Sequence, residues 1–297
     1  DLDVNEIKKG GTAESWMRIH IERDFISDDL SAVVAGLARV LTDVRKAVND
    51  WPAMRTKAIE VSSDLRSKPP VGIDQGDLDE AIALLDWLTQ DSFTFVGYRE
   101  YDLVEVDGRD ALHPVHGTGL GVLRTNDEQD LLASVAVLPP ASRARAREKS
   151  LLVLSKANSR STVHRPAHLD YIGVKKFDAL GNVVGEQRFL GIFAARAYSD
   201  SVSDIPVVRA KCLQVEANLD YVSGSHSAKD LEEFLDTYPR DELFQIDSVQ
   251  LAEVARSVLH LKERRQTKLY IRYDSYERFV SALVYFPRDR YTTAIRL

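Results

Sequence analysis

The amino-acid sequence predicts an α+β fold, in which an antiparallel sheet is flanked by long helices. Segments rich in β-branched and aromatic residues follow one another between about residues 93 and 193, with turn residues between them. Apolar residues at helical spacing occur on both sides of this region, before residue 90 and after residue 204. Strands that are grouped in the sequence, with helices before and after them, are typical of α+β modules.

The strongest β signal lies in the stretch from Tyr171 to Tyr198. Two β-rich runs, Tyr171–Phe177 and Val183–Phe193, flank the turn residues Leu180-Gly181-Asn182. Glycine and asparagine tolerate the positive φ that a tight turn requires. We therefore expect a β-hairpin here, with the other strands arranged around it. The elements expected before it are a strand at Phe93–Tyr98, a pair of strands at Tyr101–Val106 and Ala111–Val115 around the turn Asp107-Gly108, a glycine-rich connection at Thr118–Arg124, a short buried strand at Leu151–Leu154 and a loop at Ser155–Pro166.

A strand and two helices are expected before the sheet. Alternating apolar residues predict a half-buried strand over residues 16–22. Asp28 or Asp29 caps the long helix that follows and extends to about Arg66, with Pro52 bending or restarting it. The apolar stripe of this helix consists of Leu30, Val33, Val34, Leu37, Val40, Leu41, Val44, Val48 and Trp51. After a break at Lys68–Gly72, Asp77 is expected to cap a short helix with inward-facing residues Leu78, Ile82, Leu85 and Leu88.

Three helices are expected after the sheet. Ile205–Val222 carries apolar residues at helical spacing, and Ser223-Gly224-Ser225 ends this helix. Ser227 is expected to cap the second helix. The third begins at a capping box formed by Asp247 and Gln250 and runs to about Lys262.

The last segment of the chain returns to β character. Residues 267–273 and 278–286 form two β-rich runs around Asp274-Ser275. They predict the first hairpin of a second, truncated α+β domain. Because the chain lacks an initiator methionine and stops within such a segment, we expect it to be a piece of a longer polypeptide.

The amino-acid composition limits the classes of partner and the cellular compartments that we expect. A net charge of −7 argues against a nucleic-acid or anionic-membrane partner, because both require clustered positive charge. The basic run Arg143, Arg145, Arg147 and Lys149 is expected to be a solvated loop or helix start. No apolar run reaches the length of a membrane span, and the single cysteine suits a reducing compartment. These features predict a cytoplasmic protein.

No residue pattern identifies a catalytic or metal site. A dinucleotide-binding motif has the spacing G-x-G-x-x-G and is followed by a helix. Gly117, Gly119 and Gly121 have a different spacing of the third glycine and no helix is expected after them, so a tight loop in the sheet is expected. Cys212 lies in an apolar helical stripe and is expected to be a buried hydrophobic residue. The histidine pairs His113/His116, near Asp110, and His164/His168 have spacings too unspecific to indicate a metal.

One weak ligand site remains. Polar residues before and within the central hairpin could line a small-ligand pocket on the sheet, although ordinary polar surface residues are the simpler explanation. These residues are Arg160, Ser161, His164, Lys175 and Arg188.

Several stretches together resemble the large bacterial NAD-specific glutamate dehydrogenases. The most distinctive are YPRDELF at residues 238–244 and VYFPRDRY at residues 284–291. Residues 84–103, 159–198, 237–255 and 268–293 carry the resemblance, which covers most of the chain from about Trp16 onward.

The resemblance implies an N-terminal segment of such an enzyme, with partial ACT-like modules around a PAS-like sheet module. Residues 1–66 would end one ACT-like module, 77–200 would form the PAS-type module, 201–266 a helical connector, and 267–297 the start of a further ACT-like module. The family's catalytic lysine and aspartate and its NAD site have no counterpart here. The implied partners are further copies in a homo-oligomer, the catalytic region of the same chain, and a possible amino-acid effector.

The resemblance favours a regulatory and oligomerisation segment that is itself non-catalytic, with NAD bound elsewhere in the parent enzyme. A free-standing PAS- or ACT-type small-molecule sensor and a complete small enzyme are the alternatives. The PAS-type pocket could also be filled by the chain's own aromatic residues Phe93, Phe95, Phe189 and Phe193.

Overall fold

The computed structural model describes residues 16–20, 30–125, 136–138, 143, 145–261, 266–276, 278–287 and 289. Compactness divides the chain into residues 1–39 and 40–297. In the first unit, Trp16–His20 is exposed and forms no strand, so the strand predicted there is wrong over these residues. The remaining residues of that prediction, and the caps Asp28 and Asp29, lie outside the described residues.

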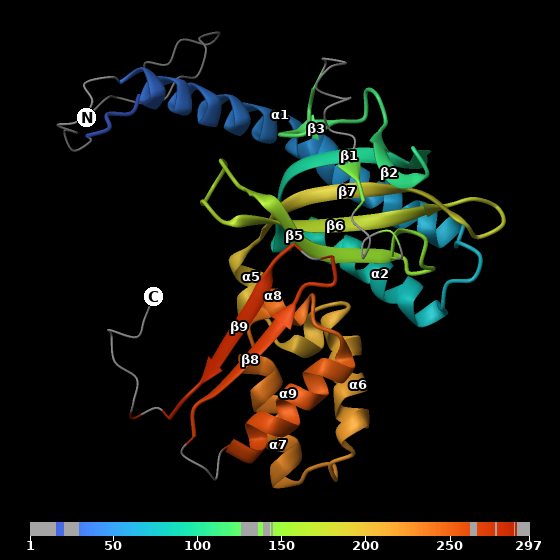
Figure 1. Ribbon diagram of the computed structural model, residues 1–297, viewed down its shortest axis with the longest axis vertical. Helices are drawn as coiled ribbons and strands as arrows, with labels where there is room; N and C mark the ends of the chain where they lie inside the picture. Colours follow the sequence, from blue (N-terminus) through green and yellow to red (C-terminus); the bar gives the residue numbers. More distant parts are fainter. Residues whose placement is uncertain are drawn as a thin grey trace, which may run out of the picture. The chain divides into compact units, whose positions relative to one another are not determined.

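The second unit is built on an antiparallel sheet, as predicted (Figure 1). Its strand order is β4-β2-β1-β7-β6-β5, and β3 also pairs with β1. The central hairpin pairs β6 with β7, and β7 pairs with β1, so the hairpin lies in the middle of the sheet. The strands are β1 (Phe93–Val106), β2 (Arg109–Pro114), β3 (Leu120–Gly121), β4 (Ala136–Val137), β5 (Leu152–Arg160), β6 (His168–Phe177) and β7 (Val183–Phe193).

Turn chemistry explains the hairpin locally. Gly181 has a φ of 78°, and the Asp178 carboxylate accepts hydrogen bonds from the backbone N–H groups of Leu180 and Asn182 at 2.9 and 2.8 Å. The loop predicted over residues 155–166 is wrong in its first half, because β5 continues to Arg160. There β5 pairs with β6 through a register shift, which the β-poor sequence SKANSR does not reveal.

Helix α1 (Ser31–Ser67) contains Pro52 and is assigned as one helix through it. The predicted apolar stripe is not the buried one: Leu41, Val48 and Trp51 are exposed. The buried positions follow another helical stripe, shifted around the axis, because the sheet packs there. They are Ala47, Asp50, Met54, Ala58, Val61, Ser62 and Leu65.

Helix α2 (Gln75–Trp87) precedes the π-helical turn η2 (Leu88–Ser92) and buries Leu78 and Leu85 as predicted. Asp74, not Asp77, is its N-cap and accepts from the Gly76 and Asp77 N–H groups. Similarly, Ser225 and not Ser227 caps α7, because its Oγ accepts from Ala228 N–H at 3.2 Å. A side-chain oxygen caps N–H groups two to three residues further on, so a sequence with several candidates leaves the position open.

The helices after the sheet gather on one side of it (Figure 1). They are α5 (Ala195–Ser199), η3 (Val202–Asp204), α6 (Val208–Leu219), α7 (His226–Thr237), α8 (Arg240–Leu243) and α9 (Ser248–Leu261). Phe193 at the end of β7 stacks on Phe244 after α8, with ring centroids 4.3 Å apart. The Glu80 carboxylate accepts from Val207 N–H at 2.6 Å and pairs with Arg209 at 2.9 Å, which fixes the start of α6 to α2.

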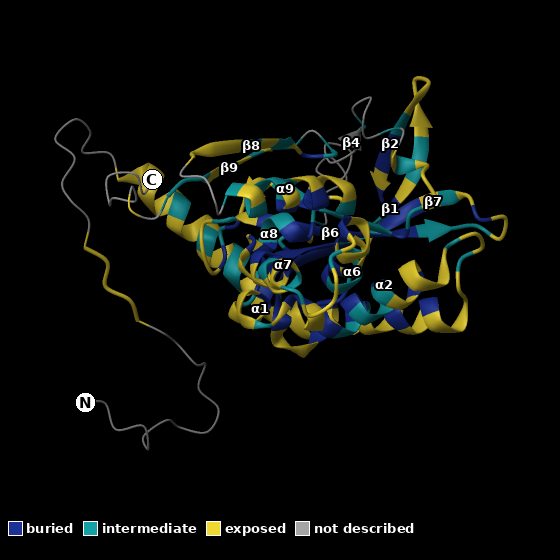
Figure 2. Ribbon diagram, turned by 90° about the horizontal axis from the view of Figure 1, so that it is seen from below, coloured by how far each residue is buried: buried dark blue, intermediate teal, exposed yellow. Residues whose placement is uncertain are grey.

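The chain ends its described part with a two-stranded ribbon, β8 (Lys268–Tyr273) and β9 (Val280–Tyr285), as predicted. Exposure alternates along β9, and along β8 from Leu269 onward (Figure 2). One face of the ribbon packs toward the helices, and the other face exposes Leu269, Ile271, Tyr273, Val280 and Val284.

Candidate functional site

Two of the five residues predicted to line a ligand pocket lie on the same face of the sheet. Lys175 on β6 stands opposite Glu186 on β7, and Arg188 follows two residues later. Side chains two residues apart on a strand share a face, so Lys175, Glu186 and Arg188 point to one side. Lys175 is buried, and Arg188 is half-buried.

The other three predicted residues lie apart from this pair. Arg160 and His164 are exposed at and beyond the end of β5. Ser161 is buried, but its hydroxyl donates to the Val163 carbonyl at 2.6 Å within its own loop. A ligand role for the five residues stays a prediction.

The face that carries Lys175 and Arg188 holds a group that we call the arginine–tyrosine stack. Its members are Tyr101, Arg145, Tyr171, Arg188, Tyr276 and Arg278. The Arg188 guanidinium lies 3.8 Å from the ring centroid of Tyr101 and 4.7 Å from that of Tyr171. Such contacts hold a guanidinium in place while its N–H groups stay available at the edge of the plane.

The stack extends from the sheet to the ribbon. Arg278, from the turn between β8 and β9, lies 4.2 Å from the Tyr171 ring centroid. Arg278 and Arg145 both lie 5.7 Å from the ring centroid of Tyr276. The buried Asp274 shapes this turn by accepting from the N–H groups of Tyr276 and Arg278 at 3.1 and 3.2 Å.

One carboxylate, that of Glu186, is buried within this group. It accepts from the Tyr171 hydroxyl and, at 3.1 Å, from Nε of Arg188. Gly173 provides the space, because a Cβ at this position would lie 2.8 Å from the Glu186 carboxyl carbon. Burial raises the pKa of Tyr171, so the phenol keeps its proton and donates it to the carboxylate.

A cavity of about 40 Å³ lies beside the stack. Arg145, Lys175 and Arg278 give its lining three cationic groups, against the single carboxylate of Glu186. The Lys175 ammonium is already held by the carbonyls of Arg145 at 2.6 Å and Glu148 at 2.8 Å, and by Ser150 Oγ at 3.0 Å. Burial lowers the pKa of Lys175.

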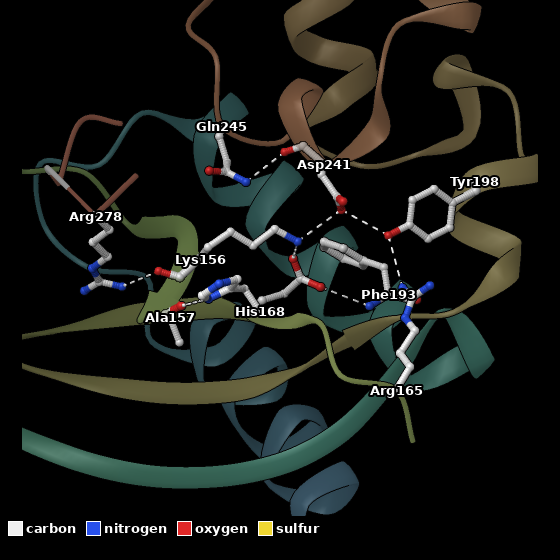
Figure 3. A network of polar contacts seen from close by, with 10 residues as sticks. Lys156, Ala157, Arg165, His168, Phe193, Tyr198, Asp241, Gln245 and Arg278 are labelled. Carbon is white, nitrogen blue, oxygen red and sulfur yellow. Dashed lines mark hydrogen bonds and ion pairs between the residues drawn. The ribbon is translucent and has the colours of Figure 1, made fainter. Parts of the chain in front are cut away.

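The opposite face of β6 carries a second polar group, the charge network of Figure 3. Asp170 precedes Tyr171, so its side chain points to the other side of the sheet. Its carboxylate accepts from Lys156 Nζ at 2.5 Å and from Phe193 N–H at 3.1 Å. Lys156 also pairs with Asp241 on α8 at 3.2 Å, and the Tyr198 hydroxyl donates to Asp241 at 3.0 Å.

The surroundings of Asp170 favour its protonated form. Burial raises the pKa of Asp170 to about 6, although the Lys156 ammonium opposes the shift. The side chain is 5% exposed, so water contributes little to stabilising the carboxylate. Asp170 therefore gains a proton at a higher pH than an ordinary aspartate.

Arg278 joins the two groups. Its guanidinium stacks on Tyr171 at one face and donates to the Lys156 carbonyl at 3.2 Å (Figure 3). Lys156 and Arg278 are 122 residues apart in the chain. The sheet, the helices after it and the ribbon therefore meet at one place.

The remaining sequence candidates have structural partners. Gly121 N–H donates to the buried Asp50 at 2.8 Å, and β3 pairs with β1, so the glycine-rich segment is a loop in the sheet, as predicted. Asp110 pairs with Arg147 and does not face a histidine site. Burial raises the pKa of Cys212 to about 11, as for the predicted buried thiol. The described residues contain no cluster of three metal-ligating side chains.

No helix in the described part of the chain has the length and apolar character of a membrane span. The aromatic residues Phe93, Phe95, Phe189 and Phe193 are all buried and in mutual ring contact. They fill the helix-facing side of the sheet, which leaves the other side for the arginine–tyrosine stack.

The sequence analysis did not identify four residues of this site, which are Tyr171, Glu186, Tyr276 and Arg278. Strand alternation could have indicated Tyr171 and Glu186, but no local signal marks Arg278.

Comparison with known proteins shows that this chain is similar to one part of glutamate dehydrogenases. The family described as glutamate dehydrogenase, helical motif 1, matches residues 205–264, and the glutamate dehydrogenase ACT2 domain matches residues 268–297. A protein named NAD-specific glutamate dehydrogenase from Halomonas elongata is 37% identical over 284 residues. Proteins of the same name from Pseudomonas aeruginosa and Mycobacterium tuberculosis are 34% and 31% identical.

These matches cover 96%, 97% and 98% of the chain. The chain in turn spans only 18%, 18% and 17% of the three relatives. The resemblance predicted from the sequence is confirmed.

Proposed function

We propose that this chain, which belongs to the NAD-specific glutamate dehydrogenase family, acts as a non-catalytic, N-terminal regulatory segment of such an enzyme. The whole enzyme would oxidatively deaminate L-glutamate to 2-oxoglutarate and ammonia with NAD. We propose that NAD binds outside this segment and that the enzyme is cytoplasmic. The sheet would act as a PAS-type module, and residues 1–66 and 267–297 would belong to ACT-like modules.

One observation carries the regulatory role. Arg278, in the region similar to the ACT2 domain, contacts Tyr171 and Lys156 of the sheet. Asp241, in the region similar to the helical motif, contacts Lys156 from the other side. A ligand that changes one of these contacts would bias the other, because both depend on the same strand positions. Coupling of this kind requires a ligand that binds the two arrangements with different affinity.

A thermal-shift screen of this chain tests the proposal, with amino acids, NAD, NADH and adenine nucleotides as ligands. A ligand that binds only the folded chain at 100 times its dissociation constant adds about 2.7 kcal/mol to the free energy of unfolding. We expect stabilisation by an amino acid and none by NAD. The same amino acid should change the activity of the whole enzyme. Stabilisation by no amino acid would contradict a sensing role.

Assembly is the second part of the proposal. The exposed ribbon face carries five apolar side chains, at 49% to 74% relative exposure. Large exposed apolar faces favour association. We propose that this chain self-associates, and Ile271→Lys should then weaken the association in sedimentation-equilibrium measurements. Lys268→Glu, on the same strand but outside the apolar face, serves as the control. A chain that stays monomeric at every concentration would contradict self-association.

A further inference from the structure

We infer that the cavity beside the arginine–tyrosine stack binds the carboxylate group of a small organic acid with a short apolar part. The inference deepens the proposed function by naming the class of ligand, and its regulatory meaning rests on that function. The binding itself depends only on the groups that line the cavity.

The charge of the lining favours an anion. The Glu186 carboxylate is already occupied by the Tyr171 hydroxyl and the Arg188 guanidinium. Among the described residues, neither Arg145 nor Arg278 has a carboxylate within 4.0 Å. Two guanidinium groups therefore border the cavity without a described counter-charge. Arg278 is half-buried and Arg145 is exposed. Both guanidinium groups can donate charge-assisted hydrogen bonds to an anion, and such bonds are stronger than those between neutral groups.

The geometry holds the Arg278 guanidinium in place before any ligand binds. Arg145 and Arg278 both border the Tyr276 ring. Arg278 also stacks on Tyr171 and donates to the Lys156 carbonyl. A guanidinium carries five N–H donors, so one bond to a carbonyl leaves several donors at its edge. Because stacking has already restricted the side chain, binding an anion costs less conformational entropy.

The other side of the cavity is apolar. The apolar lining consists of Leu103, Leu112, Leu138, Ala146, Val153 and Val183. The volume of about 40 Å³ corresponds to roughly three water molecules. A carboxylate group that carries one or two further carbon atoms fits such a space, with its charge toward Arg145 and Arg278. Apolar walls next to a few placed charges are typical of small-molecule sites.

Calorimetric titration of the 297-residue chain with propionate at constant ionic strength tests this inference. Propionamide, which has the same shape without the charge, and inorganic phosphate, which has the charge without the apolar part, are the comparison ligands. We expect saturable binding of propionate that is at least tenfold tighter than binding of either comparison ligand. Equal binding of propionamide or phosphate, or no saturable binding of propionate, would overturn the inference.

Variants locate the site. Arg278→Gln and Arg145→Gln should each weaken propionate binding at least tenfold, because each removes one guanidinium. Arg145 is exposed, so its variant should fold even where Arg278→Gln does not. Arg160→Gln is the matched control, since Arg160 is an exposed arginine outside the cavity. Unchanged affinity in Arg145→Gln would overturn the inference.

The same variants separate this site from the proposed function. If propionate binds this chain as expected but no small acid changes the activity of the whole enzyme, the site stands and the regulatory function fails. If an amino acid regulates the whole enzyme but propionate does not bind this chain, the regulatory function stands and this site fails.

Discussion

The central sheet and the β8–β9 ribbon have similar β-rich sequences but different surroundings. In β6, seven consecutive residues from Leu169 to Lys175 are buried. In β9, and in β8 from Leu269 onward, exposed and partly buried residues alternate. The sheet is covered by helices on one face and by the arginine–tyrosine stack and part of α1 on the other, whereas the ribbon is covered on one face only.

The formation of a strand and the burial of its side chains therefore have separate causes. On the open face of the ribbon, Leu269 stands opposite Val284, and Tyr273 opposite Val280. These apolar pairs have the same character as pairs inside the sheet. Local sequence therefore specifies a strand, while the layers that pack on it decide how much each side chain stabilises the fold.

The largest difference should appear on removing a core ring from the sheet. Phe189 is fully buried and contacts Tyr98 at 4.9 Å between ring centroids. Phe189→Ala should lower the free energy of unfolding by about 3–5 kcal/mol, because it leaves a cavity. Urea unfolding measures this loss. Val184→Ala, at a partly exposed position of the same strand, should cost less than about 1 kcal/mol; equal losses would contradict the role of burial.

The attachment of the ribbon should be the next largest effect. Arg272 on β8 pairs with Glu242 on α8, and both side chains are nearly buried, at 10% and 12% exposure. Glu242→Ala leaves the guanidinium without its partner and should cost about 2–3 kcal/mol. Hydrogen exchange should quicken in the ribbon and not in β6. The control is Glu253→Ala, which changes an exposed glutamate on α9. If Glu253→Ala quickens exchange in the ribbon as much as Glu242→Ala does, the Arg272–Glu242 pair does not attach the ribbon.

The charge network should give a pH dependence to the sheet. The pKa of Asp170 is about 6 in the folded chain, above the ordinary value of about 3.9. The folded state therefore binds this proton more tightly than the unfolded state does. The resulting contribution to the stability of the fold is present below pH 4 and is lost as the pH rises through 6. The free energy of unfolding of the unsubstituted chain, measured relative to that of Asp170→Asn, should therefore fall by about 2 kcal/mol between pH 4 and 6.

A second aspartate provides the opposite sign. Hydrogen bonds from Asn182 lower the pKa of Asp178 in the β6–β7 turn. Its contribution is present above the ordinary aspartate pKa and is lost as the pH falls. Comparing Asp170→Asn with Asp178→Asn over the same pH range should show slopes of opposite sign. Slopes of the same sign would contradict the assigned environments.

The smallest effect is expected on the open face of the ribbon. Ile271 is 56% exposed. Ile271→Thr keeps the β-branched shape and should change the free energy of unfolding by less than about 0.5 kcal/mol. Leu283→Thr, on the inward face of the ribbon, should cost more because Leu283 packs against the core. Equal losses, measured by thermal unfolding, would show that the two ribbon faces are covered alike.

The candidate site could be predicted only in part. Lys175 and Arg188 were predicted as pocket residues and do share a face, because residues two apart on a strand share a side and the hairpin fixes the register. Arg160 and His164 were grouped with them because they are near in sequence, yet they lie at the exposed end of β5. Arg278 and Asp241 were missed, since nothing local indicates which strand they approach.

Patterns within the sequence were enough to predict the α+β fold, the central hairpin, the end ribbon and the resemblance to glutamate dehydrogenases. These follow from turn residues, from periodicity and from short distinctive runs, all of which depend on neighbours in the chain. The tertiary structure decided which stripe of α1 is buried, how far β5 extends and which charges meet. Those outcomes depend on contacts such as that between Lys156 and Arg278, 122 residues apart. Each side chain's neighbourhood is then set by packing, which local patterns do not encode.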